Sequence, residues 1–262
     1  MSSILSNEKM FHLKIKPGVV GKYVILTGDP ERVPKIAEHL KNSSLLSKNR
    51  EYTIYNGYLN NVLVTVASTG IGGPSAAICV EELIKCGADT FIRVGTSGGM
   101  KLDVVGGDLC IATAVVKDEG TSAEYLPNSY PAVADFDVVT ALVNSAKKLS
   151  DKKSGNSYHV GVVQSKDSFY GETNPETMAV EKALKQRWEA ELRLDCLCSE
   201  MECAAIFSVA LTRKIRAGAV LLAIWNVERT AHGLDNPSYQ DATRAIKCAL
   251  LAIKELMEKD SK

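Results

Sequence analysis

The sequence has no excess of either charge, since Lys plus Arg and Asp plus Glu each number 31 among 262 residues. No run of basic residues interrupts this balance, so the composition gives no sign of a surface that binds nucleic acid. No apolar stretch is long enough to span a membrane, and the opening residues lack the apolar core of a signal peptide. We therefore expect a cytoplasmic protein without a membrane or nucleic-acid partner. Local arginines can still bind a small anionic ligand.

Histidine is scarce, and its four residues are scattered singly: His12, His39, His159 and His232. Isolated histidines do not indicate a zinc site, which needs clustered ligands. The seven cysteines are odd in number, and most lie in apolar patterns: Cys79, Cys86, Cys110, Cys196, Cys198, Cys203 and Cys248. We expect buried thiols in a reducing compartment rather than disulfides.

Short apolar runs alternate with helical patterns along most of the chain. Strands are expected at Tyr23–Thr27, Arg50–Tyr58, Val62–Ser68, Phe91–Gly95, Asp108–Val116 and His159–Gln164. Helices are expected at Pro74–Cys86, Glu202–Arg213 and Asp241–Lys259, and from an N-cap at Asp29 to about Leu40. The alternation predicts an α/β fold with a mostly parallel or mixed sheet covered on both faces. Because Lys147–Asn156 is typical of a surface turn rather than a linker, residues 1–262 are predicted to form a single domain.

Three glycine-bearing turns follow expected strands, at Gly28–Arg32, Ser68–Ser75 and Arg93–Gly99. Ligands of open α/β sheets bind beyond the carboxyl ends of the strands, where glycine lets backbone N–H groups approach an anion. Neither the dinucleotide-binding spacing nor the Walker spacing occurs. Taken by itself, each turn is better explained by a purely structural role, because glycine also serves tight turns at no steric cost.

Arginines beside these turns favour an anion site. Arg93 lies within the apolar strand FIRVG, where an unpaired guanidinium is costly. It must therefore meet either an anionic ligand or a buried carboxylate. Arg32 and Arg50 taken alone would be ordinary surface residues.

Two carboxylates, Glu200 and Glu202, flank Met201 where an apolar helix is expected to begin. Acids in the first turn are favoured by the helix dipole, so one interpretation is simply a helix start. The other is a carboxylate that accepts hydrogen bonds from a sugar diol. Together with the arginines, this pattern suggests phosphate at one end of a site and a polyol in its middle.

Eight ordered segments resemble the type-I nucleoside phosphorylases, most closely the uridine phosphorylases of the bacterial type. They are FHL (11–13), GDPERV (28–33), REY (50–52), STGIGGPS (68–75), RVGTSG (93–98), YPAVADF (130–136), DSFY (167–170) and EMECAA (200–205). The resemblance implies a single α/β domain with a central, partly barrel-like mixed sheet flanked by helices. It implies a pentosyltransferase of nucleoside salvage, which uses inorganic phosphate to convert uridine, and also deoxyuridine or thymidine, into the base and ribose 1-phosphate. Dimers, usually stacked into hexamers, are implied as well.

The resemblance also implies the role of each matching residue. Phosphate would be bound by Gly28, Arg32, Arg93 and Thr96, with Arg50 from a neighbouring subunit. The ribose would be bound by Met201 and Glu202, with His12 of the neighbour at the 5′-hydroxyl. Phe169 would pack against the base, and Gly98 would line its slot. Members of this branch can hold a monovalent cation such as K⁺ at the dimer interface, through the positions of Glu51, Ile71 and Ser75. No other cofactor is implied.

The base slot departs from the family pattern. The uridine branch typically reads F-Y-P-G-Q-x-R, whereas residues 169–174 read FYGETN and lack both the glutamine and the arginine. Lys166 and Arg229 are our candidates for binding the base and, beside Arg93, for catalysis, because the departing uracil needs donors at its carbonyl oxygens. Lys166 could instead be a solvated lysine at a strand end.

Three alternatives share part of this pattern. A purine nucleoside phosphorylase would differ in the base slot, with Glu228 as the acid. A nucleoside hydrolase would replace phosphate by water, although the three arginines argue against it. A protein that binds nucleosides without turnover is the alternative from a different class.

Overall fold

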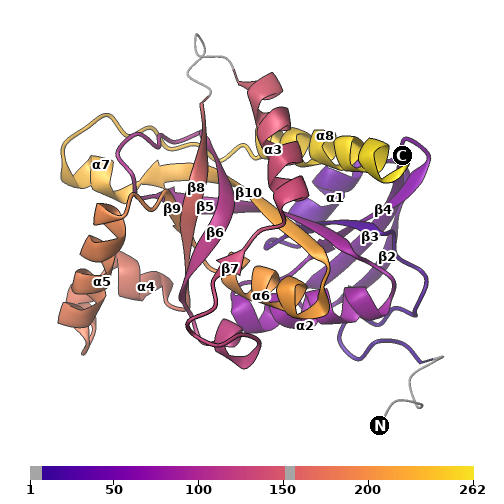
Figure 1. Ribbon diagram of the computed structural model, residues 1–262, viewed down its shortest axis with the longest axis horizontal. Helices are drawn as coiled ribbons and strands as arrows, with labels where there is room; N and C mark the ends of the chain where they lie inside the picture. The colour runs from indigo at the N-terminus through magenta and orange to yellow at the C-terminus, as the bar shows by residue number, and fades with distance from the viewer. Residues whose placement is uncertain (1–7, 151–156) are drawn as a thin grey trace.

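The computed structural model describes residues 8–150 and 157–262, and within them one mixed sheet runs through the centre of the molecule (Figure 1). Its strands are β1 (Tyr23–Thr27), β2 (Lys41–Asn49), β3 (Tyr52–Leu59), β4 (Val62–Ser68), β5 (Thr90–Gly99), β6 (Leu109–Asp118), β7 (Ala132–Val133), β8 (Tyr158–Lys166), β9 (Cys198–Glu200) and β10 (Arg216–Asn226). Most are apolar runs buried along their length, as expected for strands covered on both faces.

Part of this sheet closes into a barrel. Strands β5, β10, β6, β8 and β9 follow one another by hydrogen bonding, and β9 returns to β5. Beyond β5 the sheet continues through β1, β4, β3 and β2. Strands β1, β4, β5 and β10 are parallel, so their carboxyl ends lie at the same edge. The predicted mixed, partly barrel-like sheet is confirmed.

Helices cover both faces of the sheet. They are α1 (Arg32–Ala37), α2 (Gly73–Lys85), α3 (Phe136–Leu149), α4 (Phe169–Thr173), α5 (Glu181–Arg193), α6 (Cys203–Arg213), α7 (Val227–Ala231) and α8 (Thr243–Asp260). Helices α2 and α6 pack together over one apolar core, which includes Leu83 and Phe207. Helices α3 and α8 pack together over the other, which includes Leu142 and Ile253 (Figure 1). Each such buried side chain stabilises the fold by about 1.5–3 kcal/mol.

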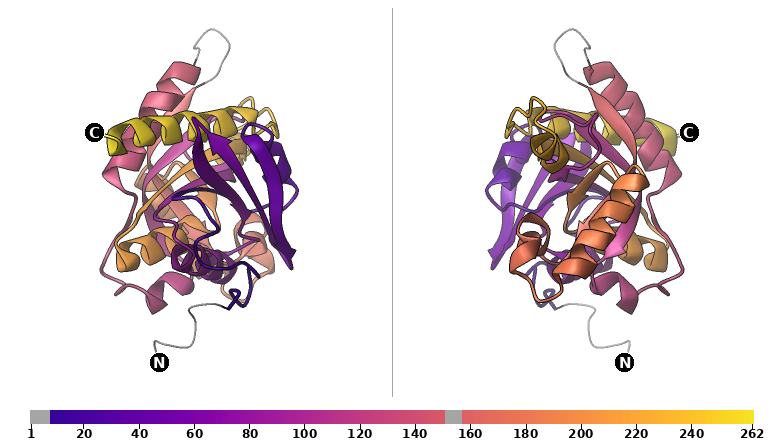
Figure 2. Two further views of the ribbon diagram at one scale, coloured as in Figure 1. Left: turned by 90° about the vertical axis from the view of Figure 1, so that its right-hand side faces the viewer. Right: turned by 90° about the vertical axis from the view of Figure 1, so that its left-hand side faces the viewer.

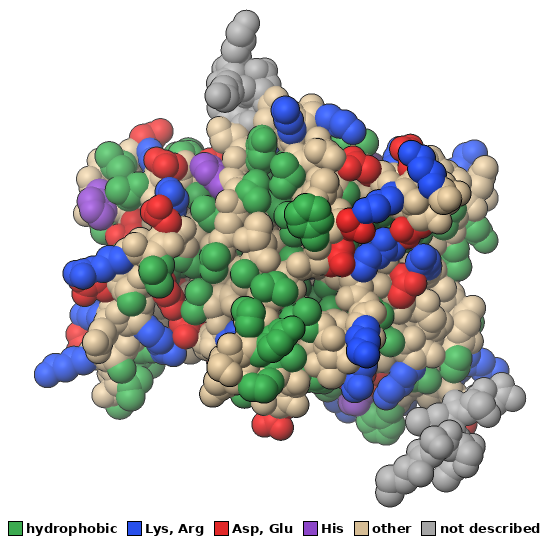
Figure 3. Space-filling view, viewed as in Figure 1, with side chains coloured by type: hydrophobic (Ala, Val, Ile, Leu, Met, Phe, Trp, Pro, Cys, Tyr) green, Lys and Arg blue, Asp and Glu red, His purple; other side chains and the backbone are tan. Residues whose placement is uncertain are grey.

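The two ends of the molecule differ. Strands β2, β3 and β4 form one end, while α4, α5 and α7 lie together at the other (Figures 1 and 2). Apolar side chains gather on the face of Figure 3 over β6, β7 and β8, where Val160, Val162, Tyr130 and Phe136 are exposed. All seven cysteines are free and buried, as predicted. Among the described helices none is both long and apolar enough to cross a membrane.

Several element boundaries differ from the prediction. Helix α1 begins at Arg32 and ends at Ala37; Asp29 is not its N-cap, because its carboxylate accepts the N–H of Glu31 at 2.8 Å instead. Strand β3 begins at Tyr52, since Arg50 adopts a left-handed turn conformation with a φ of 54°. The expected turn at 147–156 is partly wrong, as α3 includes Lys147; residues 151–156 lie outside the described part of the chain.

Four larger elements were not predicted, for different physical reasons. Strand β2 is polar and exposed, and α5 is a charged surface helix, so neither carries a clear apolar period. The apolar run of β10 is 11 residues long, a length at which a buried strand cannot be told from a buried helix without a period. Helix α3 did have a signal, since Asp135 accepts the N–H groups of Asp137 and Val138 as an N-cap.

Asp260, the last residue of α8, connects that helix to the sheet through hydrogen bonds. Asp260 accepts hydrogen bonds from Arg216, Tyr23 and Lys22 at 2.5–3.3 Å. These bonds, those from Arg216 above all, hold the pKa of Asp260 below its usual range.

We expect Asp260→Asn to lower the free energy of unfolding at pH 7 by about 1 kcal/mol, because the carboxylate is partly exposed. A carboxylate whose pKa is lower in the folded state stabilises that state at any pH above its unfolded pKa of about 4. This stabilisation is lost as the pH falls through the pKa of the folded state. Urea unfolding should therefore show the two proteins converging in acid. Glu258→Gln, on the exposed side of the same helix, is the control; an equal loss in both variants would contradict the assignment.

Candidate active site

A cavity of about 710 Å³ opens where the carboxyl ends of the parallel strands meet. Six segments and β10 form its wall: the turn after β1, the turn before β3, the turn between β4 and α2, strand β5, the β8–α4 junction, and the β9–α6 junction. The structure brings most of the predicted residues together there: Gly28, Arg32, Glu51, Ile71, Ser75, Arg93, Thr96, Gly98, Lys166, Phe169, Met201 and Glu202.

Two arginines approach each other at one end of the cavity. Arg32 donates to the Thr27 hydroxyl at 3.1 Å and, among the described residues, forms no ion pair. Burial lowers its pKa; the charge of the neighbouring Asp29 carboxylate opposes this, and the charge of Arg93 adds to the lowering. Thr96 lines the same cavity as the two arginines. Two positive charges that disfavour each other in a half-buried cavity are a suitable binding place for an anion.

Arg93 itself is buried and paired. Its Nε donates to Glu200 at 3.0 Å and its Nη2 donates to Glu202. Burial alone would lower the pKa of Arg93, but the charges of Glu202 and Glu200 raise it. The expected carboxylate partners therefore exist. Nη1 has no hydrogen-bond partner among the described residues, and a methyl group placed on Gly28 would lie 4.0 Å from it. One donor of Arg93 thus remains beside the glycine turn.

The two glutamates at the β9–α6 junction, Glu200 and Glu202, have different roles. Glu200 accepts the N–H groups of Glu202 and Cys203 at 2.9 Å, so it performs the helix-start role at α6. Glu202 lines the cavity, where it accepts the N–H of Gly72 at 2.7 Å. Gly72 has a φ of 90°, which favours glycine. Burial raises the pKa of Glu202, and the charge of Arg93 opposes this. A fixed, buried carboxylate in mid-cavity is suited to bind a diol.

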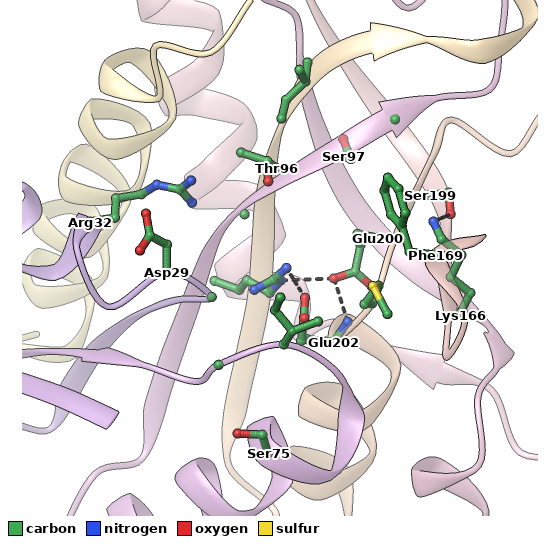
Figure 4. A pocket seen from close by; sticks show the side chains of 18 of the residues that line it. Asp29, Arg32, Ser75, Thr96, Ser97, Lys166, Phe169, Ser199, Glu200 and Glu202 are labelled. Atoms are coloured by element: carbon green, nitrogen blue, oxygen red, sulfur yellow. Dashed lines mark hydrogen bonds and ion pairs between the residues drawn. The ribbon is translucent and has the colours of Figure 1, made fainter. Parts of the chain in front are cut away.

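Lys166 lies at the other end of the cavity, beside Phe169 (Figure 4). Its Nζ donates to the Ser199 hydroxyl at 2.5 Å and forms an ion pair with Glu172 at 2.6 Å. Only 8% of the residue is exposed, so the alternative of a solvated lysine is wrong. Glu172 was not predicted as a site residue. Its signal was an acid six positions after Lys166, on the far side of the turn that leads into α4.

Glu51 and Ser75 meet at the rim of the cavity. The Ser75 hydroxyl donates to the Glu51 carboxylate at 2.8 Å. The backbone N–H of Glu51 and then this hydroxyl lower the pKa of Glu51, despite an opposing effect of burial. The side chain of Ile71 is 77% exposed beside them. The three positions predicted to hold a cation therefore lie together on an outward-facing edge.

Three predicted residues do not line the cavity of their own chain. Arg229 donates to the carbonyls of Asp235 at 2.6 Å and Leu102 at 2.7 Å. His12 lies 2.8 Å from the Glu82 carboxylate, and Arg50 is exposed in the turn before β3. For His12 and Arg50 this arrangement leaves the predicted contribution to a neighbouring subunit as a prediction.

Comparison with known proteins gives a family and several relatives. Residues 22–257 match the phosphorylase superfamily. The uridine phosphorylase of Treponema pallidum is 47% identical over 261 residues, which cover 100% of this chain and 99% of the relative. The uridine phosphorylase of Thermococcus kodakarensis is 42% identical over 82% of this chain and 77% of its own length. The guanosine phosphorylase of Halorubrum lacusprofundi is 38% identical over 95% of this chain and 99% of its own length.

Proposed function

The chain belongs to the phosphorylase superfamily, and from this premise we propose that it cleaves uridine with inorganic phosphate to give uracil and ribose 1-phosphate. The observation that carries the proposal is the free donor of Arg93, which faces Gly28 in the same cavity as Arg32. A hydrolase would have no use for two arginines at the place where water attacks. An anion as nucleophile needs them.

The reaction follows from the order of these groups. A phosphate oxygen, oriented by Arg32, Arg93 and Thr96, forms a bond to C1′ while the bond from C1′ to N1 of the base breaks. The electron pair of that bond leaves with uracil, whose N1 then takes a proton from water. Glu202 holds the ribose hydroxyls, and Lys166 stabilises the negative charge that develops on the base. Prearranged charge and positioning supply the rate.

Uridine is preferred over a purine nucleoside in this proposal because uridine phosphorylases are the more similar relatives. Glu228, the acid of the purine alternative, does not line the cavity; it accepts the indole N–H of Trp188 at 2.7 Å. Phosphorolysis assays with uridine, thymidine, inosine and adenosine, each with and without phosphate, decide between the alternatives. Inosine cleaved faster than uridine would overturn the pyrimidine assignment.

The assembly in this proposal is a homo-oligomer built from dimers. Arg50 directly precedes Glu51, which lines the rim of the cavity, so a two-fold partner docked at this rim can receive Arg50 and His12 and can return its own. The same rim would hold K⁺ between Glu51, Ser75 and Ile71. The apolar side chains over β6, β7 and β8 support further stacking into a hexamer (Figure 3).

Lys166→Met should lower kcat by about a hundredfold, since a donor that acts on developing charge contributes more to the transition state than to binding. KM for uridine should change much less. Steady-state kinetics with uridine measure both. Lys117→Met, which removes a half-buried lysine that lies outside the cavity and donates to two backbone carbonyls, is the matched control. An unchanged kcat in Lys166→Met would remove Lys166 from the mechanism.

A further inference from the structure

We propose that Lys166 and Glu172 together recognise the edge of the base on which a carbonyl group stands beside a ring N–H. The proposal rests on the proposed function and specifies its substrate class. Uracil carries such an edge, and so do hypoxanthine and guanine. Cytosine and adenine carry an amino group beside an unprotonated ring nitrogen instead.

The free hydrogen-bonding groups of the pair carry the proposal. An ammonium group has three N–H donors, and Lys166 directs two of them to Ser199 and Glu172. Oε2 of Glu172 is the oxygen that meets Lys166 and Ser199; the structure gives no hydrogen bond to its Oε1 within residues 8–150 and 157–262. The side chains are 10% and 8% exposed. One donor and one acceptor therefore remain on two residues that contact each other and both line the cavity.

A buried network fixes where the pair stands. The Gln164 amide donates to Asp118 at 2.9 Å and to Glu191 at 2.7 Å, which directs its carbonyl oxygen to the Ser199 hydroxyl at 2.7 Å. Oγ of Ser199 also lies 2.5 Å from Oε2 of Glu172, so its single proton is shared between the Gln164 and Glu172 oxygens, and its lone pairs accept from Lys166. Two buried polar residues, Gln164 of β8 and Ser199 of β9, thus hold the ammonium in one position, which a merely solvated ion pair would not require.

The position of the pair matches the place of the base. Figure 4 shows Arg32 on one side of the cavity and Lys166 with Phe169 on the other, with Glu202 between them. A nucleoside with its ribose on Glu202 and its reacting carbon toward the arginines extends its base to Phe169. The anchored ribose fixes the register of the base, so an unsuitable edge cannot slide into a better pairing.

The edge then decides which base is accepted. The lysine donates to the carbonyl oxygen and Oε1 of Glu172 accepts the ring N–H. With cytosine or adenine, the Glu172 carboxylate faces the lone pair of the unprotonated ring nitrogen. The anchored ribose prevents the base from shifting to a better pairing. Sites that hydrogen-bond a substrate group reject analogues without it by about 10⁴-fold. We expect kcat/KM to favour the oxo base over the amino base by at least about a thousandfold.

The test compares matched nucleosides within each ring size, uridine against cytidine and inosine against adenosine, in phosphorolysis by the wild type and by Glu172→Gln. The amide has the shape of the carboxylate but adds a donor that satisfies an unprotonated ring nitrogen. We expect the preference for the oxo base to fall by about a hundredfold or more. Glu172→Asp, which keeps the carboxylate, should retain the preference at a lower rate. Glu81→Gln, at a surface pair with Arg213, is the control and should leave the ratio unchanged.

Two outcomes overturn the proposal: a wild type that cleaves cytidine within tenfold of uridine, or a Glu172→Gln variant that keeps the wild-type ratio. Absence of phosphate-dependent cleavage of every nucleoside would instead overturn the proposed function. In that case, the affinities of the wild type and of Glu172→Gln for uracil and cytosine, measured by calorimetry, test recognition of the base edge independently of cleavage. Equal affinities for both bases in the wild type would contradict it.

Discussion

Arg32→Ala and Arg93→Ala should each lose phosphate affinity by about ten- to a hundredfold, together with most of the activity. A hydrogen bond from a charged donor contributes about 1.5–3 kcal/mol, and each arginine offers at least one to the anion. The two variants should differ in stability. Arg93 neutralises Glu200 and Glu202 in the interior, so its removal leaves two buried carboxylates and costs about 3–5 kcal/mol.

Arg32, unlike Arg93, does not neutralise a buried carboxylate. Among the described residues its one side-chain hydrogen bond goes to the Thr27 hydroxyl. Arg32→Ala should therefore fold nearly as well as the wild type and still bind phosphate poorly. Calorimetric titration with phosphate and urea unfolding separate the two effects. Arg93→Lys, which keeps the charge but loses the guanidinium fork, should recover stability more than phosphate affinity. Wild-type affinity in Arg32→Ala would show that the anion binds elsewhere.

Mixing Arg50→Ala with Arg32→Ala should restore activity that neither variant has alone. In a two-fold dimer each site would combine Arg32 of one chain with Arg50 of its partner. A mixed dimer then holds one site with both lesions and one with none. Random reassembly makes about half of the dimers mixed, so activity should reach about a quarter of the wild type.

The experiment unfolds the two variants together, refolds them, and compares the mixture with each variant refolded alone. Native mass spectrometry reports whether mixed dimers form. An inactive mixture that contains mixed dimers would show that Arg50 does not act on the partner's site. The structure motivates this test, since Arg50 is exposed in a turn while its neighbour Glu51 lines the cavity rim.

Local sequence patterns were enough to predict many of the strands and helices that form the core of this protein. Apolar strands such as Tyr23–Thr27 and the apolar stripe of α8 appear in the structure, because burial on both faces gives a strand a short apolar run and burial on one face gives a helix an apolar period. The polar β2 and the charged α5 have little apolar surface to bury and left no such period. Their positions depend on neighbours that are distant in sequence.

The site was predictable where chemistry forces a choice. A guanidinium in the apolar strand FIRVG requires a partner, and Arg93 has two, which lie more than a hundred residues further along the chain. Their identity could not be read from the strand alone. Glu172 shows that even a partner only six residues away could not be predicted from the sequence. Its pairing with Lys166 depends on how the turn into α4 directs both side chains into one cavity.

The role of phosphate as the nucleophile is tested most directly by ³¹P NMR of a mixture of uridine, phosphate and the enzyme. We expect a new ribose 1-phosphate signal, with one phosphate consumed for each uracil released and no uracil formed when phosphate is left out. Uracil released together with free ribose in the absence of phosphate would contradict it.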